Sequence, residues 1–305
     1  MSRLPWEKTP DHVRADVEAL LGARVVDAVT QPGGYSPGVA ARLRLDDGRR
    51  AFVKSVGPEL NPDSPGIHRA EARVAAALPP SAPVPRLLGS FDRDGWVTLV
   101  LEDVDGAPPR EPWDAAELDR VLAALADLAA AMTPAPIEAP TVAERFGPAF
   151  RGWRRLAAGA APEGLDPWAR EHLAGLAELE ASWETAAAGD TLAHADVRAD
   201  NVLLTPDRVV IVDWPWACRS APWFDLLAML PSVRLQGGPP PARVFAAHPL
   251  AASADDAPVT AVLAAIAGFF VHGGRLPPPP GLPTLRDFQR AQGEIALAWL
   301  RDRLE

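Results

Sequence analysis

A polar run between apolar flanks, "LAHADVRADNVLL" from Leu192 to Leu204, holds the residues of this chain best suited to chemistry. Asp196 and Asn201 stand five positions apart in it, and Asp213 follows at the end of the β-branched run "VVIVDW". Asn and Asp oxygens are hard ligands that suit Mg²⁺, with phosphate oxygens and waters completing its octahedron. Asp196, a separate carboxylate, is placed to accept the proton of an attacking hydroxyl. The structural alternatives are a strand-end cap for Asp213 and a turn former for Asn201.

Lysine is rare in this chain, so its position is informative. The sequence contains 28 Arg and two Lys, and Lys54 lies in the strand-like run "RAFVKSV". A lysine offers a compact point charge that an arginine does not. On the helix that follows, Glu71 shares a face with Ile67, Val74 and Leu78, and a buried carboxylate needs a cationic partner. Lys54 can be that partner; the alternative is that Glu71 reaches water from the edge of this face.

A glycine-rich turn, "QPGGYSPG", precedes this strand. It contains Gly33, Gly34, Ser36 and Gly38. Glycines let backbone N–H groups approach phosphates closely, although a simple hairpin uses the same residues.

The expected elements fall into two regions. Strands are predicted at 24–30, 39–45, 50–56, 86–91 and 96–101, with helices at 9–22 and 64–78. From Asp114, which has a capping-box Glu117 three residues later, the pattern is helical. Further helices are expected near 141–158, 166–188, 221–230, 253–272 and 284–304, interrupted by a small hairpin at 202–204 and 209–212. This layout predicts an α+β fold with a β-rich N-terminal lobe, 1–102, and a helical C-terminal lobe, 103–305.

Composition narrows the class of protein. The 305 residues are 48% hydrophobic with a net charge of −10, which disfavours a general nucleic-acid binder. A lone cysteine, Cys218, excludes an internal disulfide and favours a reducing compartment. The start lacks the apolar core of a signal peptide. The run "VTAVLAAIAGFFVHGG" offers only about 12 apolar residues, too few to span a bilayer. We therefore expect a soluble cytoplasmic protein without a membrane partner.

Taken as a set, these motifs resemble the aminoglycoside phosphotransferase family, within the bilobed protein-kinase-like fold that also includes choline and other small-molecule kinases. The resemblance rests on "GGYSPG", Lys54, Glu71, "VLEDVDG", "HADVRADN" and "IVDW", in the same order across residues 30 to 230. It implies that Lys54 holds the α- and β-phosphates of a nucleotide and that Glu71 orients it. It also implies that the loop from Gly33 to Gly38 covers the phosphates, with Ser36 donating to one of them.

The resemblance assigns the remaining roles. Asp196 would be the catalytic base, Asn201 and Asp213 would hold Mg²⁺, and His194 and Asp225 would brace the catalytic loop. The adenine-reading hinge would be Leu101, Glu102, Asp103 and Val104.

The chain departs from the family pattern in places. Ala195 stands where the family usually has Gly, Ala199 and Asp200 where it has Pro-Gly, and Pro215 where an acid is common. Arg198 and Asp200 add charges to this loop. They either pair with each other, which is the favoured reading, or contact phosphate and substrate.

These features predict an ATP- and Mg²⁺-dependent phosphotransferase acting on a hydroxyl of a small molecule, with GTP not excluded. The acceptor is an aminoglycoside-like compound, an amino sugar, an amino alcohol or another metabolite. The segment between Asp213 and Asp225 is too short for the activation loop of a regulated protein kinase. The alternative is a nucleotide-binding pseudokinase or regulatory binding protein of the same fold, although binding alone does not require Asp196. Accidental motifs in an unrelated α+β protein are the third reading.

Two residue groups could shape an acceptor pocket. Acids that would suit an amine are Glu144, Glu163, Asp166, Glu171, Glu178 and Glu180, although solvated helix faces explain them better. The tryptophans Trp153, Trp168, Trp214, Trp216 and Trp223 could line a pocket, but core packing explains most of them.

Overall fold

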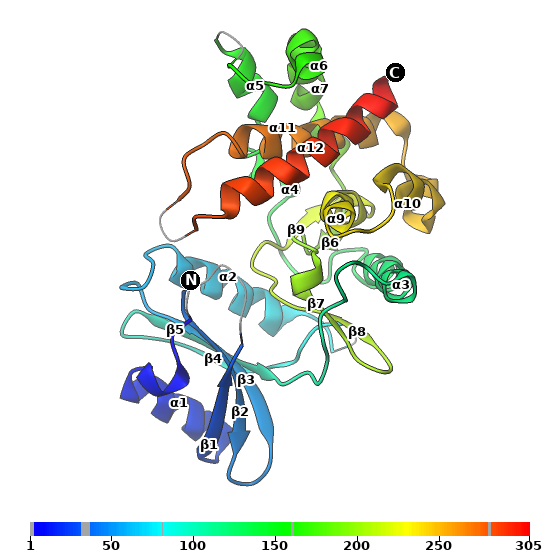
Figure 1. The fold of residues 1–305 in the computed structure, drawn as a ribbon. Coiled ribbons are helices and arrows are strands. Elements are labelled where there is room, and N and C mark those ends of the chain that lie inside the picture. Colours follow the sequence, from blue (N-terminus) through cyan, green and yellow to red (C-terminus); the bar gives the residue numbers. More distant parts are fainter. Residues whose placement is uncertain (1–2, 32–36, 81, 160–161, 280–281) are drawn as a thin grey trace. The chain divides into compact units, whose positions relative to one another are not determined.

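A computed structural model describes residues 3–31, 37–80, 82–159, 162–279 and 282–305. The chain forms two compact units (Figure 1): unit 1 is Met1–Pro108 with Asp200–Trp216, and unit 2 is Pro109–Ala199 with Ala217–Glu305. Unit 1 therefore includes a segment from the second half of the chain. Backbone hydrogen bonds attach this segment to the rest of unit 1. Ala107 and Leu204 bond to each other in both directions, at N–O distances of 3.1 and 2.8 Å. The Ile211 N–H donates to the Pro83 carbonyl oxygen at 2.8 Å.

Unit 1 is built on a five-stranded antiparallel sheet in the order β1-β2-β3-β5-β4. The strands are β1 (Val25–Thr30), β2 (Val39–Leu45), β3 (Arg50–Val56), β4 (Leu87–Arg93) and β5 (Trp96–Glu102). All five predicted strands are confirmed. A tight turn joins β2 to β3, and Gly48 occupies the left-handed region there at φ +85°.

The alternation of side chains along the strands gives the sheet two packed faces. On one face Val53 and Val100 join a buried cluster with Val17 and Leu21 of α1 (Asp11–Leu21). On the other, Leu99 and Leu101 of β5 pack with Phe52 of β3 and Ala72 of α2 (Ser64–Ala77). Figure 1 shows these two helices on opposite sides of the sheet. Lys54 lies two positions after Phe52 and so points to the α2 side.

The buried face of α2 differs from the predicted one. His68, Glu71 and Val74 are buried, at spacings of three residues, whereas Ile67 is only half-buried. A histidine tolerates this position because its Nδ1 lies 3.2 Å from the Ser64 carbonyl oxygen. Satisfying one polar edge of the ring lowers the cost of burying it.

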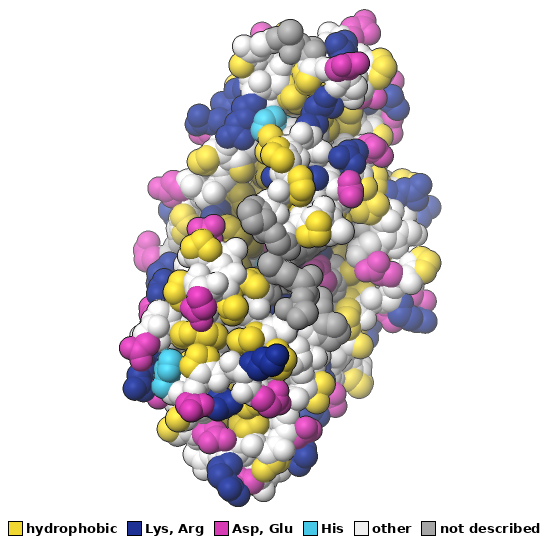
Figure 2. All heavy atoms as spheres, turned by 60° about the vertical axis from the view of Figure 1, so that its left-hand side comes forward, with side chains coloured by type: hydrophobic (Ala, Val, Ile, Leu, Met, Phe, Trp, Pro, Cys, Tyr) yellow, Lys and Arg dark blue, Asp and Glu magenta, His cyan; other side chains and the backbone are white. Residues whose placement is uncertain are grey.

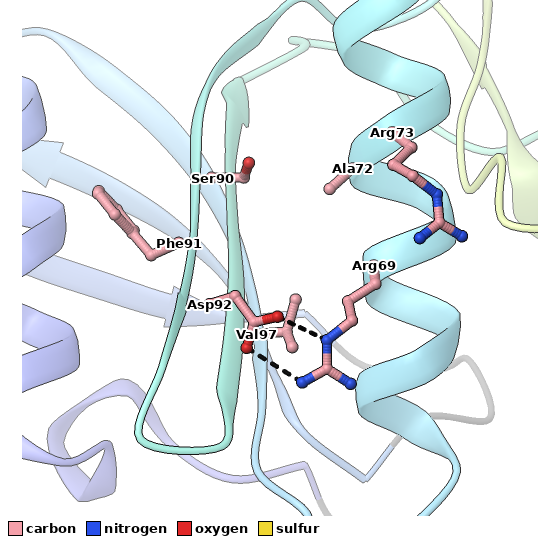
Figure 3. Close-up of a pocket in the computed structure, with 7 residues that line it drawn as sticks. All are labelled: Arg69, Ala72, Arg73, Ser90, Phe91, Asp92 and Val97. Atoms are coloured by element: carbon pink, nitrogen blue, oxygen red, sulfur yellow. Dashed lines mark hydrogen bonds and ion pairs between the residues drawn. The ribbon is translucent and has the colours of Figure 1, made fainter.

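Another face of α2 borders a small cavity of about 330 Å³ beside β4 and β5 (Figure 3). Arg69 donates from Nε and Nη2 to the two carboxylate oxygens of Asp92, at 2.6 and 3.0 Å. The two charges therefore compensate each other across the cavity. Unit 1 is completed by η1 (Trp6–Lys8) and by the hairpin of β7 (Val202–Leu204) and β8 (Val209–Ile211), and η2 (Ala199–Asn201) leads into that hairpin.

Unit 2 is mainly helical, as predicted. Its helices are α3 (Ala115–Ala131), α4 (Val142–Phe146), α5 (Gly152–Ala157), α6 (Pro167–Glu171), α7 (Leu173–Ala181), α8 (Trp183–Ala186), α9 (Phe224–Leu235), α10 (Pro241–Ala247), η3 (Pro249–Ser253), α11 (Asp256–Gly273) and α12 (Leu285–Leu304). A short strand pair, β6 (Thr191–Ala193) with β9 (Cys218–Ser220), was not predicted. Asp114 caps α3 as expected, but Glu117 bonds to Arg110 instead of completing a capping box.

Helix α11 is longer than the apolar run that the sequence suggested. It has 18 residues with a mean hydropathy of 1.4, so by length and composition alone it reaches the size of a membrane span. Of that window, 56% is buried inside the structure. Contacts with α5, α7, α8, α9 and α12 account for this burial, which is the environment of a core helix.

Candidate active site

The Lys54 ammonium of β3 is the centre of an ion cluster in unit 1. Its Nζ lies 2.7 and 2.9 Å from the two carboxylate oxygens of Glu71 and 2.7 Å from Asp213 Oδ1. An ammonium has three N–H donors, and each one here has a carboxylate acceptor. Glu71 is only 4% exposed, so it does not reach water from the helix edge. Glu71 therefore forms the ion pair with Lys54, which was one of the two alternatives that the sequence allowed.

The charges of the cluster hold Lys54 in its protonated form. Burial disfavours the Lys54 ammonium, but the charges of Asp213 and Glu71 outweigh that cost and raise the pKa of this lysine. Lys54 therefore stays protonated at neutral pH. Asp213 is the more accessible of the two carboxylates, with 43% of its side chain exposed. The charge of this carboxylate also acts on Arg3, where it opposes the lowering of the Arg3 pKa by burial.

Asn201 is held next to the segment that carries Asp213. The Val212 N–H donates to the Asn201 carbonyl oxygen at 2.9 Å, and Asn201 is 4% exposed. Asp213 itself has φ +69°, a left-handed conformation that aspartate adopts more readily than most residues. An amide oxygen and a carboxylate from adjacent backbone segments form a donor set of the kind that Mg²⁺ prefers.

His68 was not singled out from the sequence, although it lies one turn before Glu71. Burial lowers the pKa of His68 to about 4, and the Lys54 charge acts in the same direction. The folded protein therefore keeps this imidazole neutral at pH values where the unfolded chain protonates it.

This difference predicts that the free energy of unfolding falls as the pH is lowered from about 6.5 to about 4. Above pH 6.5 the neutral His68 makes its full contribution to the free energy of unfolding. Lowering the pH to about 4 removes about 3 kcal/mol of it. Urea denaturation of the native chain and of His68→Gln over this range measures it. Other groups titrate in both proteins, so the difference between the two pH profiles isolates His68. Parallel profiles would contradict the prediction.

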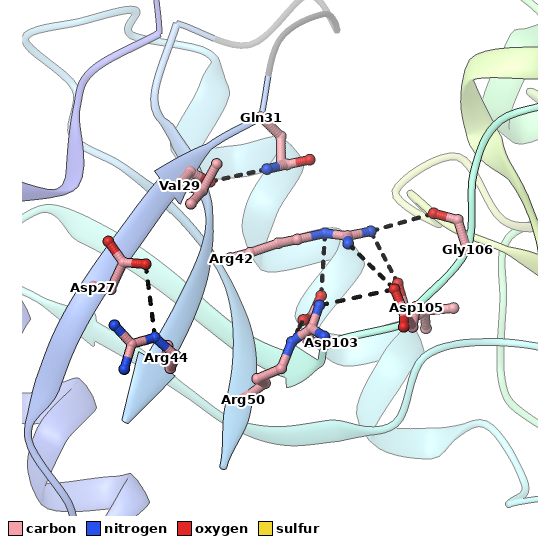
Figure 4. A network of polar contacts seen from close by, with 10 residues as sticks. Asp27, Val29, Gln31, Arg42, Arg44, Arg50, Asp103, Asp105 and Gly106 are labelled. Carbon is pink, nitrogen blue, oxygen red and sulfur yellow. Dashed lines mark hydrogen bonds and ion pairs between the residues drawn. The ribbon is translucent and has the colours of Figure 1, made fainter. Parts of the chain in front are cut away.

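The predicted hinge carries a buried acid. Asp103, whose side chain is 1% exposed, lies 3.3 Å from Arg42 Nε and 2.6 Å from Arg50 Nε. Arg42 also donates to the Val104 carbonyl oxygen at 3.0 Å. Figure 4 shows both arginines reaching from the sheet to this segment. These contacts hold the backbone of the hinge in place. The Val104 carbonyl oxygen already accepts a hydrogen bond from Arg42.

The start of the hinge is anchored as well. Leu101 is buried in the cluster beneath α2, and Glu102 accepts a hydrogen bond from Arg208 at 2.9 Å. The part that 101–104 play in reading adenine remains a proposal.

Of the glycine-rich turn, only its end can be described. Gly33, Gly34 and Ser36 lie outside the described residues. A Cβ at Gly38 would lie 2.3 Å from the Ser55 carbonyl oxygen and 2.8 Å from Val56 Cβ. Close approach to β3 therefore explains Gly38 without any ligand.

In unit 2, the loop that carries Asp196 is held by backbone hydrogen bonds to a buried acid. Asp225 accepts from the N–H groups of His194 and Ala195, at 2.8 and 2.7 Å. Burial raises the pKa of Asp225, against the effect of these two backbone hydrogen bonds. The Asp196 N–H donates to His194 Nδ1 at 3.1 Å. The bracing roles suggested for His194 and Asp225 match these contacts.

Ala195 occupies the left-handed region at φ +66°. Its N–H bond to Asp225 imposes this conformation, which costs an L-residue roughly 1–2 kcal/mol and glycine very little. A glycine at this position would avoid the strain that the alanine carries.

We expect Ala195→Gly to change the free energy of unfolding by less than about 1 kcal/mol, because relief of strain is offset by about 0.4–1 kcal/mol of unfolded-chain entropy. Ala195→Val should destabilise by about 1–3 kcal/mol, since a β-branched residue fits φ > 0 poorly. Urea denaturation distinguishes them. Equal stabilities of the Gly and Val variants would show that the loop does not impose this backbone conformation.

Arg198 lies against Asp196 in the same loop. Its Nη1 is 3.1 Å from Asp196 Oδ1, and its guanidinium carbon lies 5.7 Å from the ring centre of Phe288 on α12. Sequence reasoning missed Phe288, which is far from the loop along the chain. Pairing of Arg198 with Asp200 stays a prediction.

Several of the acids suggested for binding an amine have structural roles instead. Glu144 forms a capping box with Thr141, and Asp166 caps α6. Glu180 is fully buried and accepts from the backbone N–H groups of Trp153 and Arg154. These three acids are therefore poor candidates for binding substrate.

Comparisons with known proteins match this architecture. The profile of the phosphotransferase enzyme family matches residues 32–263. No curated protein sequence matches the chain.

Solved structures give the same picture. Choline kinase LicA from Streptococcus pneumoniae superposes with a TM-score of 0.61 at 13% identity, over 95% of this chain and 98% of that one. A choline/ethanolamine kinase family protein from Mesorhizobium loti gives 0.57 at 18% identity, over 97% and 94%. Amicoumacin kinase hAmiN, in complex with AMP-PNP, Ca²⁺ and Ami, gives 0.58 at 12% identity, over 95% and 94%. The chain belongs to the phosphotransferase enzyme family and is a small-molecule kinase with a protein-kinase-like fold.

Proposed function

We propose that the chain transfers the γ-phosphate of ATP, with Mg²⁺, to a hydroxyl group of a small molecule. The observation that carries the proposal is the Lys54 ammonium, held by Glu71 and Asp213 at 2.7 Å each. A fixed, protonated lysine beside an accessible carboxylate is the arrangement that phosphoryl transfer requires for charge balance. Presence of AMP-PNP and Ca²⁺ in the structurally similar amicoumacin kinase supports a nucleotide with a divalent cation.

Each predicted site residue would have its own role in this reaction. Lys54 would bind the α- and β-phosphates and Leu101 to Val104 would hold the adenine. Asp196 would accept the hydroxyl proton while the acceptor oxygen bonds to the γ-phosphorus and the bond to the β-phosphate oxygen breaks, releasing ADP. Mg²⁺, held by Asn201 and Asp213, would offset the phosphate charge.

Asp196 is prepared for this role by its neighbours. The Arg198 contact and the His194 hydrogen bond fix the carboxylate and the backbone of this residue. Since enzymes of this class mainly position groups and balance charge, a restrained base favours phosphoryl transfer. This supports an enzyme rather than a binding protein, which needs no base.

The acceptor class proposed is broad: aminoglycoside-like compounds, amino sugars, amino alcohols and other hydroxylated metabolites. We place the reaction in the cytoplasm, where ATP is available and a free thiol such as the buried Cys218 stays reduced.

The test is ADP formation with Mg²⁺-ATP across a panel of these acceptors, repeated with GTP and with EDTA. One acceptor should stimulate ADP release well above the hydrolysis background, with stoichiometric phosphorylated product by mass spectrometry. The Asp196→Ala variant should retain nucleotide binding without product.

Thermal unfolding measures nucleotide binding separately. Saturating Mg²⁺-ATP at a hundred times its Kd should add about 2.7 kcal/mol of stability. Stabilisation without turnover on any acceptor would favour the nucleotide-binding alternative. No stabilisation at any ATP concentration would overturn the proposal.

A further inference from the structure

Unit 2 contains a basic pocket that the proposed reaction does not use. It has a volume of about 560 Å³, and it is lined by Leu156, Pro162, His272, Gly274, Arg275, Leu276 and Arg290. The pocket lies where α11 ends and α12 begins. On the face shown in Figure 2, basic side chains gather beside a histidine in the upper part, next to exposed hydrophobic groups. A volume of this size suits a small organic ligand.

The arginines around the pocket are held mainly by neutral acceptors. Arg275 donates to the backbone carbonyls of Gly164, at 3.2 Å, and of Glu163. Arg286 donates to the Pro277 carbonyl at 3.0 Å and to the side-chain oxygen of Gln289 at 2.7 Å. These bonds orient the guanidinium groups but leave their positive charge uncompensated.

The remaining arginines follow the same pattern with one exception. Arg155 donates to the Pro148 carbonyl at 2.6 Å, and Arg290 to the Gly274 carbonyl at 3.1 Å. Only Arg290 has a carboxylate partner within the described residues, Asp287 at 2.8 Å. Asp287 is 74% exposed, so solvent screens that pair. Of these four arginines, Arg275 and Arg290 line the pocket, and within the described residues the one ion pair among them is that of Arg290.

The pKa of His272 responds to the positive charges around the pocket. Burial lowers its pKa, and the charges of Arg155 on α5 and Arg286 on α12 lower it further. The imidazole is therefore less protonated than a free histidine at the same pH. A bound anion would reverse this effect, because it would stabilise the imidazolium and screen the arginines.

We propose that this pocket binds the anionic group of a small molecule that carries a phosphate or a carboxylate. Arg275 and Arg290 are placed to bind the anion, since guanidinium groups form paired hydrogen bonds with both groups. Leu156, Pro162 and Leu276 supply an apolar wall for the rest of the ligand. The pocket is distinct from the contact that Phe288 of α12 makes with Arg198 of the catalytic loop. Phe288 and Arg290 are two positions apart on α12, so they lie on nearly opposite sides of that helix.

The test follows His272 by NMR during titration with inorganic phosphate, and separately with acetate, at constant ionic strength set by chloride. We expect phosphate to shift the His272 resonance saturably and to raise the pKa of this imidazole. His68 lies near Lys54 and reports phosphate binding there instead. The Lys54→Met variant should lose a His68 response and keep the His272 response, which separates this site from the proposed active site.

Leu276→Glu tests the charge requirement without removing any native hydrogen bond. Leu276 is 40% exposed and lines the pocket, so a carboxylate there should be tolerated and should repel the anion. We expect at least a tenfold weaker phosphate affinity than in Leu276→Gln, the matched neutral control. Arg275→Gln with Arg290→Gln should weaken it similarly. An unchanged His272 resonance at saturating phosphate and acetate, or equal affinity in the Glu and Gln variants, would overturn the proposal.

Discussion

Asp196→Asn should lower kcat for phosphoryl transfer by about 10²–10⁴-fold, the usual contribution of a general base. An amide oxygen can still accept from Arg198, which contacts Asp196 Oδ1 at 3.1 Å, so the loop should keep its shape. What the variant lacks is a basic oxygen for the hydroxyl proton. Because the base acts in the chemical step, the KM for ATP should change little.

The control for this variant is Asp190→Asn, which removes a carboxylate that is 60% exposed just before β6. It should retain full activity. Steady-state kinetics and thermal unfolding on all three proteins separate a catalytic loss from a folding defect. A kcat within threefold of the native value in Asp196→Asn would remove this residue from the mechanism.

Lys54→Arg should reduce kcat/KM by about 10²–10³-fold, the magnitude found when one preorganised charged donor is lost. The ammonium satisfies three carboxylate oxygens within 2.7–2.9 Å at a single atom. A planar guanidinium spreads its donors over a larger group and cannot place them there without moving α2 or Asp213. The Lys54→Arg variant therefore keeps the positive charge but loses the placement of the ammonium donors.

The second lysine of the chain provides the matched control. Lys8→Arg changes an exposed residue outside the cluster and should have no effect on activity. Lys54→Met should in addition destabilise the fold by about 3–5 kcal/mol, because it leaves two carboxylates without their buried cation. Lys54→Met with Glu71→Gln should recover part of that stability but no activity. Full activity in Lys54→Arg would exclude a geometric requirement for the ammonium.

The sequence predicted those parts of the structure whose signals are local and periodic. The strands at 39–45 and 50–56 have the bounds of β2 and β3, because alternation and the "DDG" turn fix both ends. The partnership of Lys54 with Glu71 follows from strand and helix periodicity. Asp213 was placed correctly beside them only through the family resemblance, since 159 positions separate it from Lys54.

Other features have no local signal. The strands β6 and β9 have three residues each, which is too short for a periodic pattern, and they pair across a segment that holds η2, β7 and β8. The contact of Phe288 with Arg198 depends on how α12 packs. His68 was overlooked because a polar residue on a buried face is permitted by one hydrogen bond, to Ser64, that the sequence does not reveal.

Because the segment Asp200–Trp216 belongs to unit 1, that unit is discontinuous in the chain. A growing polypeptide therefore cannot finish its first unit until residue 216 has left the ribosome, well after β1 to β5 have emerged. Until then Lys54 and Glu71 lack Asp213, and Pro83 and Ala107 lack the strand segment that they bind. Nascent chains stalled before this point should be more sensitive to protease in their N-terminal portion than chains stalled beyond it.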